Sequence, residues 1–284
     1  MQSYKDEAYY LYRECFPEDS EACSDFIFEN SLNYAKKMTL YDEGELRCVM
    51  WLVDKTVSIY NKEIVAPHVV GLATDPKHRY KGYAKKLLAD ALNTVHAPFI
   101  TLYPFSHAFY ERFGFTTVSY DFPTPVDEPS RPATDKEAIE TYASLCKDLD
   151  FYNIRTEKEF AYYRGVYGAD GGDISISKYG LHTPDGFIPS TFARTGIKGV
   201  MARVVDLESL IKVSEITITE PLTVVDDLVA RNNLTFVADR GNITECDKGT
   251  LVVTASEIIS AFFGQCQKLY PYFPPLRGFL ADKY

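Results

Sequence analysis

The stretch Val69–Val95, VVGLATDPKHRYKGYAKKLLADALNTV, decides the fold of this 284-residue chain. It begins as an apolar run that predicts a β-strand, turns at Asp75-Pro76, and continues into the basic sextet Arg79–Ala84. Apolar side chains then recur at the spacing of one helix face, at Ala84, Leu87, Leu88, Ala91, Leu92 and Val95. The stretch therefore predicts a strand, a loop and an amphipathic helix.

The loop of this unit is suited to an anionic group. The first amides of a helix lack partners within the chain and carry the positive end of the macrodipole, so a helix start can bind phosphate. Gly82 allows the backbone to approach a ligand closely, and Arg79 and Lys81 add full positive charges. An ordinary strand, loop and helix with a basic turn fits the same residues, and the loop alone does not separate the two interpretations.

The sextet Arg-x-x-Gly-x-Ala, placed between an apolar strand and an amphipathic helix, resembles the acetyl-CoA signature of the GCN5-related N-acetyltransferase (GNAT) superfamily. The resemblance implies an α/β GNAT fold with a mixed sheet and acetyl-CoA as cosubstrate. It also implies that the preceding strand splays from its neighbour. By the same resemblance the pyrophosphate would lie on the loop, at Arg79, Tyr80, Lys81, Gly82, Tyr83 and Ala84. The strand residues Leu72, Ala73 and Thr74 would pair with the pantetheine arm, and we also assign Phe105 and Ser106 to the cofactor.

A second informative stretch is Pro98–Val118, PFITLYPFSHAFYERFGFTTV. It predicts a strand at Phe99–Tyr103 and a helix at Ser106–Arg112 that stops at Gly114. The motif Phe-Tyr-x-Arg-Phe-Gly-Phe resembles the GNAT segment in which a tyrosine protonates the departing CoA thiolate, a role that falls here on Tyr110. Simple packing is the alternative for one tyrosine among 21.

Composition limits the class of protein. A content of 46% hydrophobic residues is enough for well-formed cores, and the length suggests two domains. The net charge of −10 argues against a nucleic-acid partner and would favour cationic substrates. No secretory signal core and no apolar run of about 18 residues occurs, which predicts a cytoplasmic protein with no membrane partner. The six cysteines form no Cys-x-x-Cys pair and the five histidines are never three or four apart, so we expect no metal site and no disulfide framework.

The order of predicted elements is that of the GNAT fold followed by a second unit. Two helices over residues 4–37, the second starting near Ser20, precede strands at Lys37–Tyr41, Arg47–Asp54 and Ser58–Tyr60. A proline-rich, acidic segment at residues 121–135 marks a boundary, and helices follow at Asp135–Leu149 and Glu157–Val166. We therefore divide the chain into a GNAT domain at residues 1–122, a linker or shortened second GNAT-like region at 123–180, and a further domain at 181–284.

The last of these units reads as an α+β domain, mainly antiparallel. Its predicted strands are Gly199–Val205, Glu215–Thr219, Leu222–Val225, Asn233–Ala238, Gly241–Cys246 and Gly249–Val253, with a short helix at Asp206–Ile211. Thr254 with Glu257 three residues later forms a capping box, and Ile258, Ile259, Phe262 and Phe263 give the following helix a buried face before Gly264.

The arrangement of both ends resembles the Eis-like (enhanced intracellular survival) acetyltransferases, whose C-terminal domain is sterol-carrier-like. The resemblance implies a homo-oligomer and a terminal carboxylate that acts as the base, here the α-carboxylate of Tyr284. Three prolines would hold the tail PYFPPLRGFLADKY extended. A frayed terminus is the alternative, but apolar Phe279 and Leu280 favour docking.

These observations predict an enzyme that transfers an acetyl group from acetyl-CoA to a primary amine of a small cationic molecule or of a lysine side chain, by direct attack on the thioester. The general base common in such enzymes, a glutamate on the strand before the loop, is absent from Val69–Thr74. The alternative is a non-catalytic protein that senses acyl-CoA or carries a lipid. An intact loop, Tyr110 and the tail together favour the enzyme, because a sensor needs only the loop.

Overall fold

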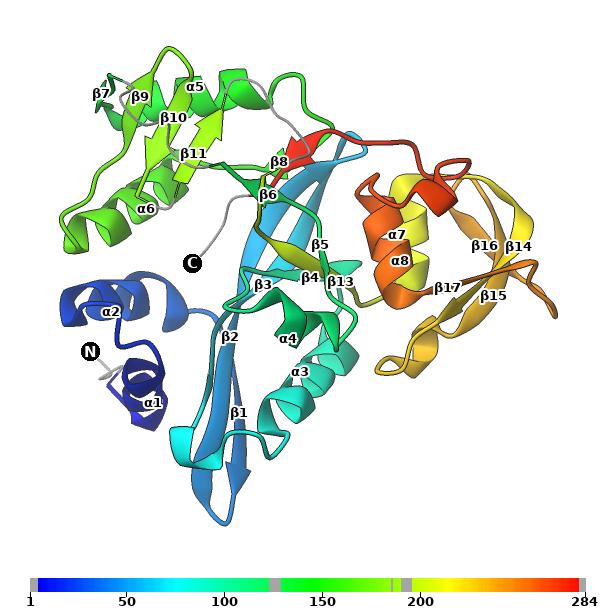
Figure 1. Cartoon of the computed structure of the whole chain (residues 1–284), viewed down its shortest axis with the longest axis horizontal. Helices are drawn as coiled ribbons and strands as arrows, with labels where there is room; N and C mark the ends of the chain where they lie inside the picture. The colour runs from blue at the N-terminus through cyan, green and yellow to red at the C-terminus, as the bar shows by residue number, and fades with distance from the viewer. Residues whose placement is uncertain (1–4, 123–128, 185, 190–195, 281–284) are drawn as a thin grey trace.

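A computed structural model describes residues 5–122, 129–184, 186–189 and 196–280 of the chain (Figure 1). Its α-helices are α1 Glu7–Cys15, α2 Glu21–Ile27, α3 Tyr83–Thr94, α4 His107–Glu111, α5 Asp135–Cys146, α6 Glu157–Ala169, α7 Leu207–Ser214 and α8 Ala255–Phe262. A π-helical turn, η1 Phe28–Leu32, follows α2, and the short 3-10 segments are η2 Pro76–His78, η3 Ala230–Asn232 and η4 Gln267–Leu269.

The strands lie in four sheets. The largest contains β1 Lys36–Asp42, β2 Glu45–Ile59, β3 Lys62–Thr74, β4 Phe99–Leu102, β5 Thr116–Thr117, β8 Phe151–Asn153, β13 Met201–Val204 and β18 Gly278–Phe279. A second sheet contains β7 Arg131–Pro132, β9 Ser175–Ser177, β10 Gly180–Thr183 and β11 Gly186–Pro189. A third contains β14 Ile218–Val225, β15 Leu234–Asp239, β16 Asn242–Glu245 and β17 Leu251–Thr254, and the last pairs β6 Tyr120–Asp121 with β12 Ile197–Lys198.

The central sheet has the order β18-β8-β2-β3-β4-β13-β5, with β1 paired to the other end of β2. The long hairpin of β2 and β3 is antiparallel, whereas β3 and β4 are parallel, so the sheet is mixed as predicted. Helix α3, between β3 and β4, provides the crossover that a parallel pair requires. Helix α3 covers one face of this sheet and α1 and α2 cover the opposite face.

The central sheet is completed by segments from distant parts of the chain. β13 lies between β4 and β5 and is antiparallel to both, with Met201 opposite Leu102 and Thr117. β8 extends the sheet beyond β2, and β18 adds a parallel strand next to β8. Residues that the sequence assigned to the second and third units therefore form part of the same sheet as the N-terminal strands.

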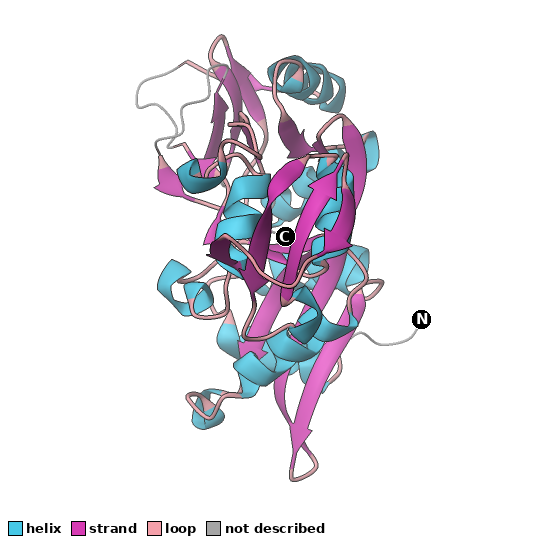
Figure 2. Cartoon of the chain, turned by 90° about the vertical axis from the view of Figure 1, so that its right-hand side faces the viewer, coloured by secondary structure: helices cyan, strands magenta, loops and turns pink. Residues whose placement is uncertain are grey.

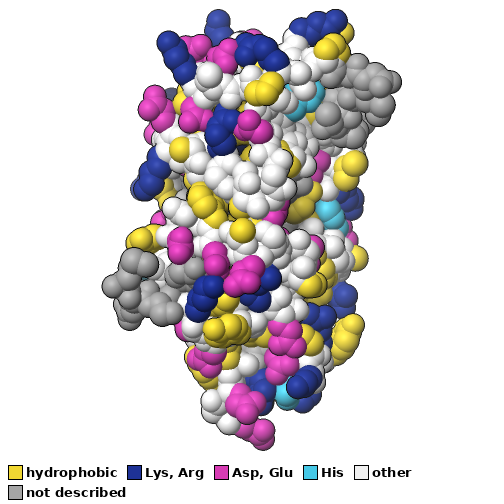
Figure 3. All heavy atoms as spheres, turned by 90° about the vertical axis from the view of Figure 1, so that its left-hand side faces the viewer, with side chains coloured by type: hydrophobic (Ala, Val, Ile, Leu, Met, Phe, Trp, Pro, Cys, Tyr) yellow, Lys and Arg dark blue, Asp and Glu magenta, His cyan; other side chains and the backbone are white. Residues whose placement is uncertain are grey.

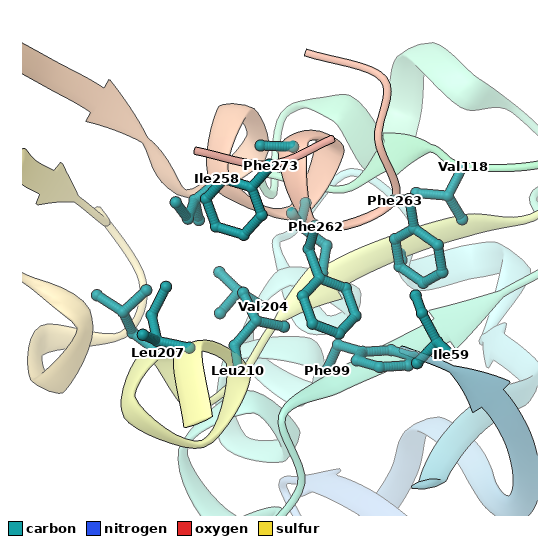
Figure 4. Packing of buried hydrophobic residues seen from close by; sticks show 14 of the residues in the cluster. Ile59, Phe99, Val118, Val204, Leu207, Leu210, Ile258, Phe262, Phe263 and Phe273 are labelled. Carbon is teal, nitrogen blue, oxygen red and sulfur yellow. The ribbon is translucent and has the colours of Figure 1, made fainter. Parts of the chain in front are cut away.

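Four buried clusters hold the layers together. In the cluster shown in Figure 4, Phe262 of α8 and the next residue, Phe263, pack against Phe99 of β4, with ring centroids 5.6 and 5.4 Å from that of Phe99. This cluster joins the central sheet to α7, α8 and the sheet of β14–β17. Full burial of one such aromatic side chain contributes roughly 1.5–3 kcal/mol to stability. The C-terminal unit is therefore packed against the N-terminal sheet through a continuous apolar core.

The middle region has a core of its own. Helices α5 and α6 pack together and against the sheet of β7, β9, β10 and β11, with Phe160, Tyr163 and Leu181 buried between them. Thr134 and Thr156 start the two helices with capping boxes to Glu137 and Glu159. This region, near the upper left of Figure 1, lies opposite the sheet of β14–β17, which faces the viewer in Figure 2.

Several predicted elements differ from the observed ones. The second N-terminal helix ends at Ile27, followed by η1, because Lys36 already pairs with Leu52 in the sheet. The predicted strands at Arg47–Asp54 and Ser58–Tyr60 form one strand, β2. Its polar residue Lys55 is buried and donates to the Tyr163 hydroxyl at 2.9 Å, so it does not break the strand.

In the C-terminal unit the predicted strands Glu215–Thr219 and Leu222–Val225 are joined as β14, with an irregularity between Ile218 and Leu222 that accommodates Pro221. The predicted capping box at Thr254 is confirmed: Thr254 N donates to Glu257 at 2.8 Å, and Glu257 N donates to Thr254 Oγ1 at 3.2 Å. Gly264 follows α8 with a positive φ of 67°, as the predicted helix end requires.

Candidate functional site

A cavity of about 590 Å³ lies where β3, the following loop and the start of α3 meet α4. Its walls are formed by the loop after α1, the end of β3, the sextet and the aromatic residues around α4. The lining residues are Cys15, Phe16, Glu18, Leu72, Ala73, Thr74, Arg79, Tyr80, Gly82, Tyr83, Ala84, Lys85, Phe105, Phe109, Arg112 and Phe113.

One wall of the cavity is an open strand edge. β3 and β4 pair at His68–Thr101 and Val69–Leu102, and the described residues pair no further along these two strands. β3 nevertheless continues to Thr74, whereas β4 ends at Leu102, so the last residues of β3 form an edge that no described strand pairs with on this side. Unpaired backbone groups on such an edge can accept an extended amide-containing ligand as an added strand. The unpaired edge is what the predicted splay requires, and the splay itself stays a prediction.

A β-bulge in β3 lies at the start of this edge. Val70 is opposite Trp51 and Ala73 is opposite Val49, so two residues, Gly71 and Leu72, face one residue of β2. Gly71 has a φ of 63°, and a Cβ there would lie 3.0 Å from the Tyr12 ring and 3.1 Å from the Trp51 ring. The bulge thus depends on glycine, and it turns the backbone around Leu72 relative to a regular strand.

The sextet forms the opposite wall. Gly82 is the N-cap of α3, with φ of 86° and no side-chain cap, and no other atom lies within 4 Å of where its Cβ would be. The first turn of α3 contains no acidic residue. The helix therefore begins with uncapped amides, next to the positive charges of Arg79 and Lys85, at the cavity wall. This is the arrangement that binds a phosphate group.

Asp75 shapes the turn before the sextet. Its carboxylate accepts from Lys77 N at 2.9 Å, lies 3.1 Å from Arg47 Nη1 and lies 2.7 Å from His78 Nδ1. Although burial opposes the shift, the Lys77 amide, His78 and Arg47 hold the pKa of Asp75 below its usual range. Asp75 is therefore a structural carboxylate.

Tyr110 lies at the base of the aromatic wall. It is buried, with 4% of its surface exposed, and its ring packs edge-on against Phe109, Phe105 and Phe115 at 5.0 to 5.8 Å. Burial, with a smaller contribution from Cys48, raises the pKa of Tyr110. Its hydroxyl makes no hydrogen bond to the residues that the structure describes. The phenol is therefore protonated at neutral pH.

Most of the predicted cofactor residues come together at this cavity. Leu72, Ala73, Thr74, Arg79, Tyr80, Gly82, Tyr83, Ala84 and Phe105 line it. Lys81 and Ser106 belong to the same loops but do not line it, and Tyr110 lies beneath the lining rings. Tyr284 lies outside the described residues. Binding of acetyl-CoA by this set remains a prediction.

The cavity also contains residues that the sequence did not reveal. Cys15 is the last residue of α1, and Phe16 and Glu18 come from the loop that follows it. Nothing in their local pattern indicates contact with a loop over 60 residues later in the chain. Cys15 Sγ donates to Thr74 O at 3.3 Å, and burial raises the pKa of the Cys15 thiol. Phe109, Arg112 and Phe113 lie within the motif around Tyr110, and helical spacing could have placed them on the same wall.

The C-terminal segment is fixed to the sheet up to the last residue described. β18 pairs with β8, and Leu280 exchanges two hydrogen bonds with Ser119: its N donates to the hydroxyl, and the hydroxyl donates to its carbonyl, both at 2.9 Å. Phe279 and Leu280 are both buried. The expectation that these two apolar residues dock is confirmed.

The surface on the side of α1, α2, α5 and α6 carries acidic and basic side chains interspersed with one another (Figure 3). Within the described residues no cluster of His, Cys, Asp and Glu could hold a metal ion. None of the helices in the described ranges combines the length and the hydropathy needed to cross a membrane.

Comparisons with known proteins agree with this architecture. Residues 2–118 match a family model described as "Acetyltransferase (GNAT) domain". No curated protein matches the chain. The match covers the N-terminal part of the chain, which is also the part whose residues line the cavity.

Solved structures resemble the chain over its whole length. A probable N-acyltransferase of unknown function from Enterococcus faecalis V583 is 13% identical with a TM-score of 0.73, covering 98% of this chain and 96% of that chain. Eis1 from Mycobacterium abscessus is 11% identical with a TM-score of 0.73, covering 100% and 99%. A GCN5-related N-acetyltransferase from Anabaena variabilis ATCC 29413 is 13% identical with a TM-score of 0.71, covering 100% and 98%. At these identities the likeness shows a shared fold, including the middle and C-terminal regions.

Proposed function

We propose that this protein is an acetyl-CoA-dependent N-acetyltransferase that acts on a primary amine of a small cationic molecule or of a lysine side chain. The observation that carries the proposal is the cavity itself: an unpaired strand edge at Leu72–Thr74 and an uncapped helix start at Gly82 line the same space. The strand edge can pair with the amides of an extended ligand, and the helix start can bind a diphosphate. Acetyl-CoA contains both groups and supplies a reactive thioester.

The chain's own groups fit the requirements of acetyl transfer. The amine nitrogen attacks the thioester carbonyl carbon, the carbon–sulfur bond breaks, and the sulfur takes up a proton. Backbone amides at the Gly71–Leu72 bulge would stabilise the negative charge that develops on the carbonyl oxygen. Tyr110 would give its proton to the leaving sulfur, which its protonated state and unbonded hydroxyl allow.

The attacking amine must lose a proton, and we propose the α-carboxylate of Tyr284 as the acceptor of that proton. Support comes from the buried anchor at Leu280, after which four residues extend at most about 14 Å. The cavity offers a competing carboxylate, Glu18, which the sequence did not suggest. The two carboxylates can be separated by substitution.

The remaining expectations belong to the same proposal. We propose that the C-terminal unit is sterol-carrier-like, that the protein works in the cytoplasm and that it assembles into a homo-oligomer, in keeping with the Eis-like resemblance. The net charge of −10 supports a cationic acceptor, because a negative surface raises the local concentration of polyamines.

A thiol-release assay tests the function. The protein is incubated with acetyl-CoA and a panel of polyamines, aminoglycosides and lysine-containing peptides, and both free CoA thiol and acetylated amine are measured. Amine-dependent thiol release with matching product supports the transferase. Tight CoA binding without thiol release for any amine supports the alternative, a protein that senses acyl-CoA or carries a lipid.

A further inference from the structure

Helix α4, which carries Tyr110, is too short to be held by its own hydrogen bonds, because it spans only His107–Glu111. In addition to the packing of its aromatic rings, polar contacts hold it from outside, and they come from one segment, residues 198–203, on and next to β13. His107 Nε2 donates to Gly199 O at 3.0 Å at the start of the helix. Lys198 Nζ lies 3.2 Å from Glu111 Oε1 at its end.

The third and most buried contact of this segment is made by Arg203. Its Nε donates to Phe113 O at 2.8 Å, directly after the helix, and its Nη1 donates to Val204 O at 2.9 Å. The Phe113 amide in turn donates to Tyr110 O at 2.9 Å. Arg203 is therefore two hydrogen bonds away from the backbone of Tyr110.

Arg203 is itself held by a carboxylate of the C-terminal unit. Its Nη2 lies 2.5 Å from Asp226 Oδ1, and both side chains are almost completely buried. The Asp226 carboxylate also accepts from Leu228 N and Val229 N at 3.0 Å and from Asn232 Nδ2 at 2.9 Å. Although burial opposes the shift, these partners, Arg203 first among them, lower the pKa of Asp226. The charge pair is thus fully bonded and rigid.

Gly114, the glycine of the motif around Tyr110, allows Arg203 to approach this segment closely. Gly114 has a φ of 76°, and a Cβ there would lie 2.7 Å from Arg203 Nε. Backbone conformation and the approach of the guanidinium both require glycine at this position. The Tyr110 segment and Arg203 are therefore built to fit each other, although they lie about 90 residues apart in the sequence.

We propose that Arg203, held by Asp226, is a positioning residue that sets the Tyr110 hydroxyl for proton donation. This inference rests on the proposed function. It gives the C-terminal unit a part in the reaction, because Asp226 belongs to that unit and acts on the general acid through Arg203 and Phe113. Arg203 does not line the cavity, so it acts through Tyr110 and not on the cofactor.

A double-mutant cycle tests the proposal in the full-length protein. Arg203→Lys keeps the positive charge but loses the guanidinium group that bonds to both Asp226 and Phe113. We expect kcat to fall about tenfold, because a small displacement of a reacting group slows the reaction strongly. The KM for acetyl-CoA should change by less than about twofold. In a Tyr110→Phe background, the same Arg203→Lys change should leave kcat nearly unaltered, because the group that it positions is already gone.

Arg231→Lys is the matched control, because Arg231 also joins the C-terminal unit to the GNAT domain. Its Nη2 donates to Leu92 O at 2.7 Å and to Val205 O at 2.9 Å, at the far end of α3 from the cavity. We expect kcat unchanged in this variant.

Equal losses of kcat from Arg203→Lys in both backgrounds, or the same loss from Arg231→Lys, would overturn the positioning role and leave the proposed function intact. Full kcat in Tyr110→Phe alone would overturn both the acid role and the positioning role. Should Arg203→Lys fail to fold, His107→Ala and Lys198→Ala loosen the same helix from its surface side and take its place in the cycle. If these two changes lower kcat equally in the parent and in the Tyr110→Phe background, the proposal is contradicted as well.

Discussion

At the scale of single residues, Tyr110 is the side chain that we propose as the acid. Its ring is fixed by neighbouring rings while its hydroxyl has no partner among the described residues. We expect Tyr110→Phe to lower kcat about hundredfold, the usual size of a general-acid contribution, and to leave the KM for acetyl-CoA almost unchanged. Steady-state kinetics with a fixed amine measures both, and a KM effect alone would reduce Tyr110 to packing.

The raised pKa of Tyr110 also fixes the direction of a pH dependence. A phenol whose pKa lies above its ordinary value stays protonated throughout the neutral and mildly alkaline range. The acid is therefore present at every pH up to about 9, and the rise of kcat with pH should report only deprotonation of the amine or of the base. We expect the pH profile of Tyr110→Phe to keep the ascending limb of the parent at a lower plateau. A shifted ascending limb would indicate that Tyr110 is the base.

We expect the proposed binding of the diphosphate to depend most directly on Gly82. Gly82→Glu would place a negative charge at the uncapped helix start and impose a strained φ, so we expect the KM for acetyl-CoA to rise more than about tenfold. Gly82→Asn is the matched control, because asparagine tolerates the left-handed conformation and adds no charge. If both variants bind CoA as well as the parent does, calorimetry would contradict the assignment of the loop.

At the scale of elements, the bulge at Gly71 and Leu72 is what makes the end of β3 differ from a regular strand. Gly71→Ala would place a methyl group about 3 Å from two aromatic rings at a positive φ, at a cost of about 1–3 kcal/mol. We expect a lower melting temperature and, in the fraction that folds, a loss of acetyl transfer larger than the loss of CoA binding. Gly44→Ala, at a positive φ in the exposed β1–β2 turn with no atom within 4 Å, is the control for strain alone. Equal behaviour of the two variants would remove the bulge from the mechanism.

Most helices and strands could be predicted because their signals are local. The periodicity of α3, the capping box of α8 and the glycine after α4 each depend on a few neighbouring residues. The pairing of β13 between β4 and β5 has no such signal, because its partners are chosen by contacts about 100 residues apart in the sequence. The charged Arg203 within the apolar run GVMARVV was the one available sign that this strand is buried against a polar partner.

The same distinction applies to the site. The sextet and the Tyr110 motif are contiguous, so their residues could be assigned from the sequence. Glu18, Cys15 and Phe16 enter the cavity only because α1 packs across β3, and no spacing rule anticipates that contact. Of the two carboxylates that we propose as the base, Glu18 was not suggested by the sequence, because the segment that carries it is placed by tertiary contacts.

At the scale of the whole molecule, the chain returns to its first sheet three times, through β8, β13 and β18. The last return brings the C-terminal segment to Ser119, beside the strand that follows the Tyr110 motif. Ser119→Ala would remove both hydrogen bonds to Leu280, and we expect turnover to fall while the melting temperature changes little, because only the tail anchor is lost. Ser119→Thr keeps the hydroxyl and serves as control. Unchanged turnover in Ser119→Ala would separate the anchor from catalysis.

Extension of the chain beyond Tyr284 tests the base itself. A few residues appended there replace the α-carboxylate with an amide and move the terminal charge away, so we expect kcat to fall about hundredfold while acetyl-CoA affinity stays nearly intact. The same residues added before Met1 are the control, since they leave the tail unchanged. Glu18→Gln is the competing arm, because it neutralises the other carboxylate at the cavity. Normal turnover in the extended protein together with a large loss in Glu18→Gln would transfer the role of base from the tail to the loop between α1 and α2.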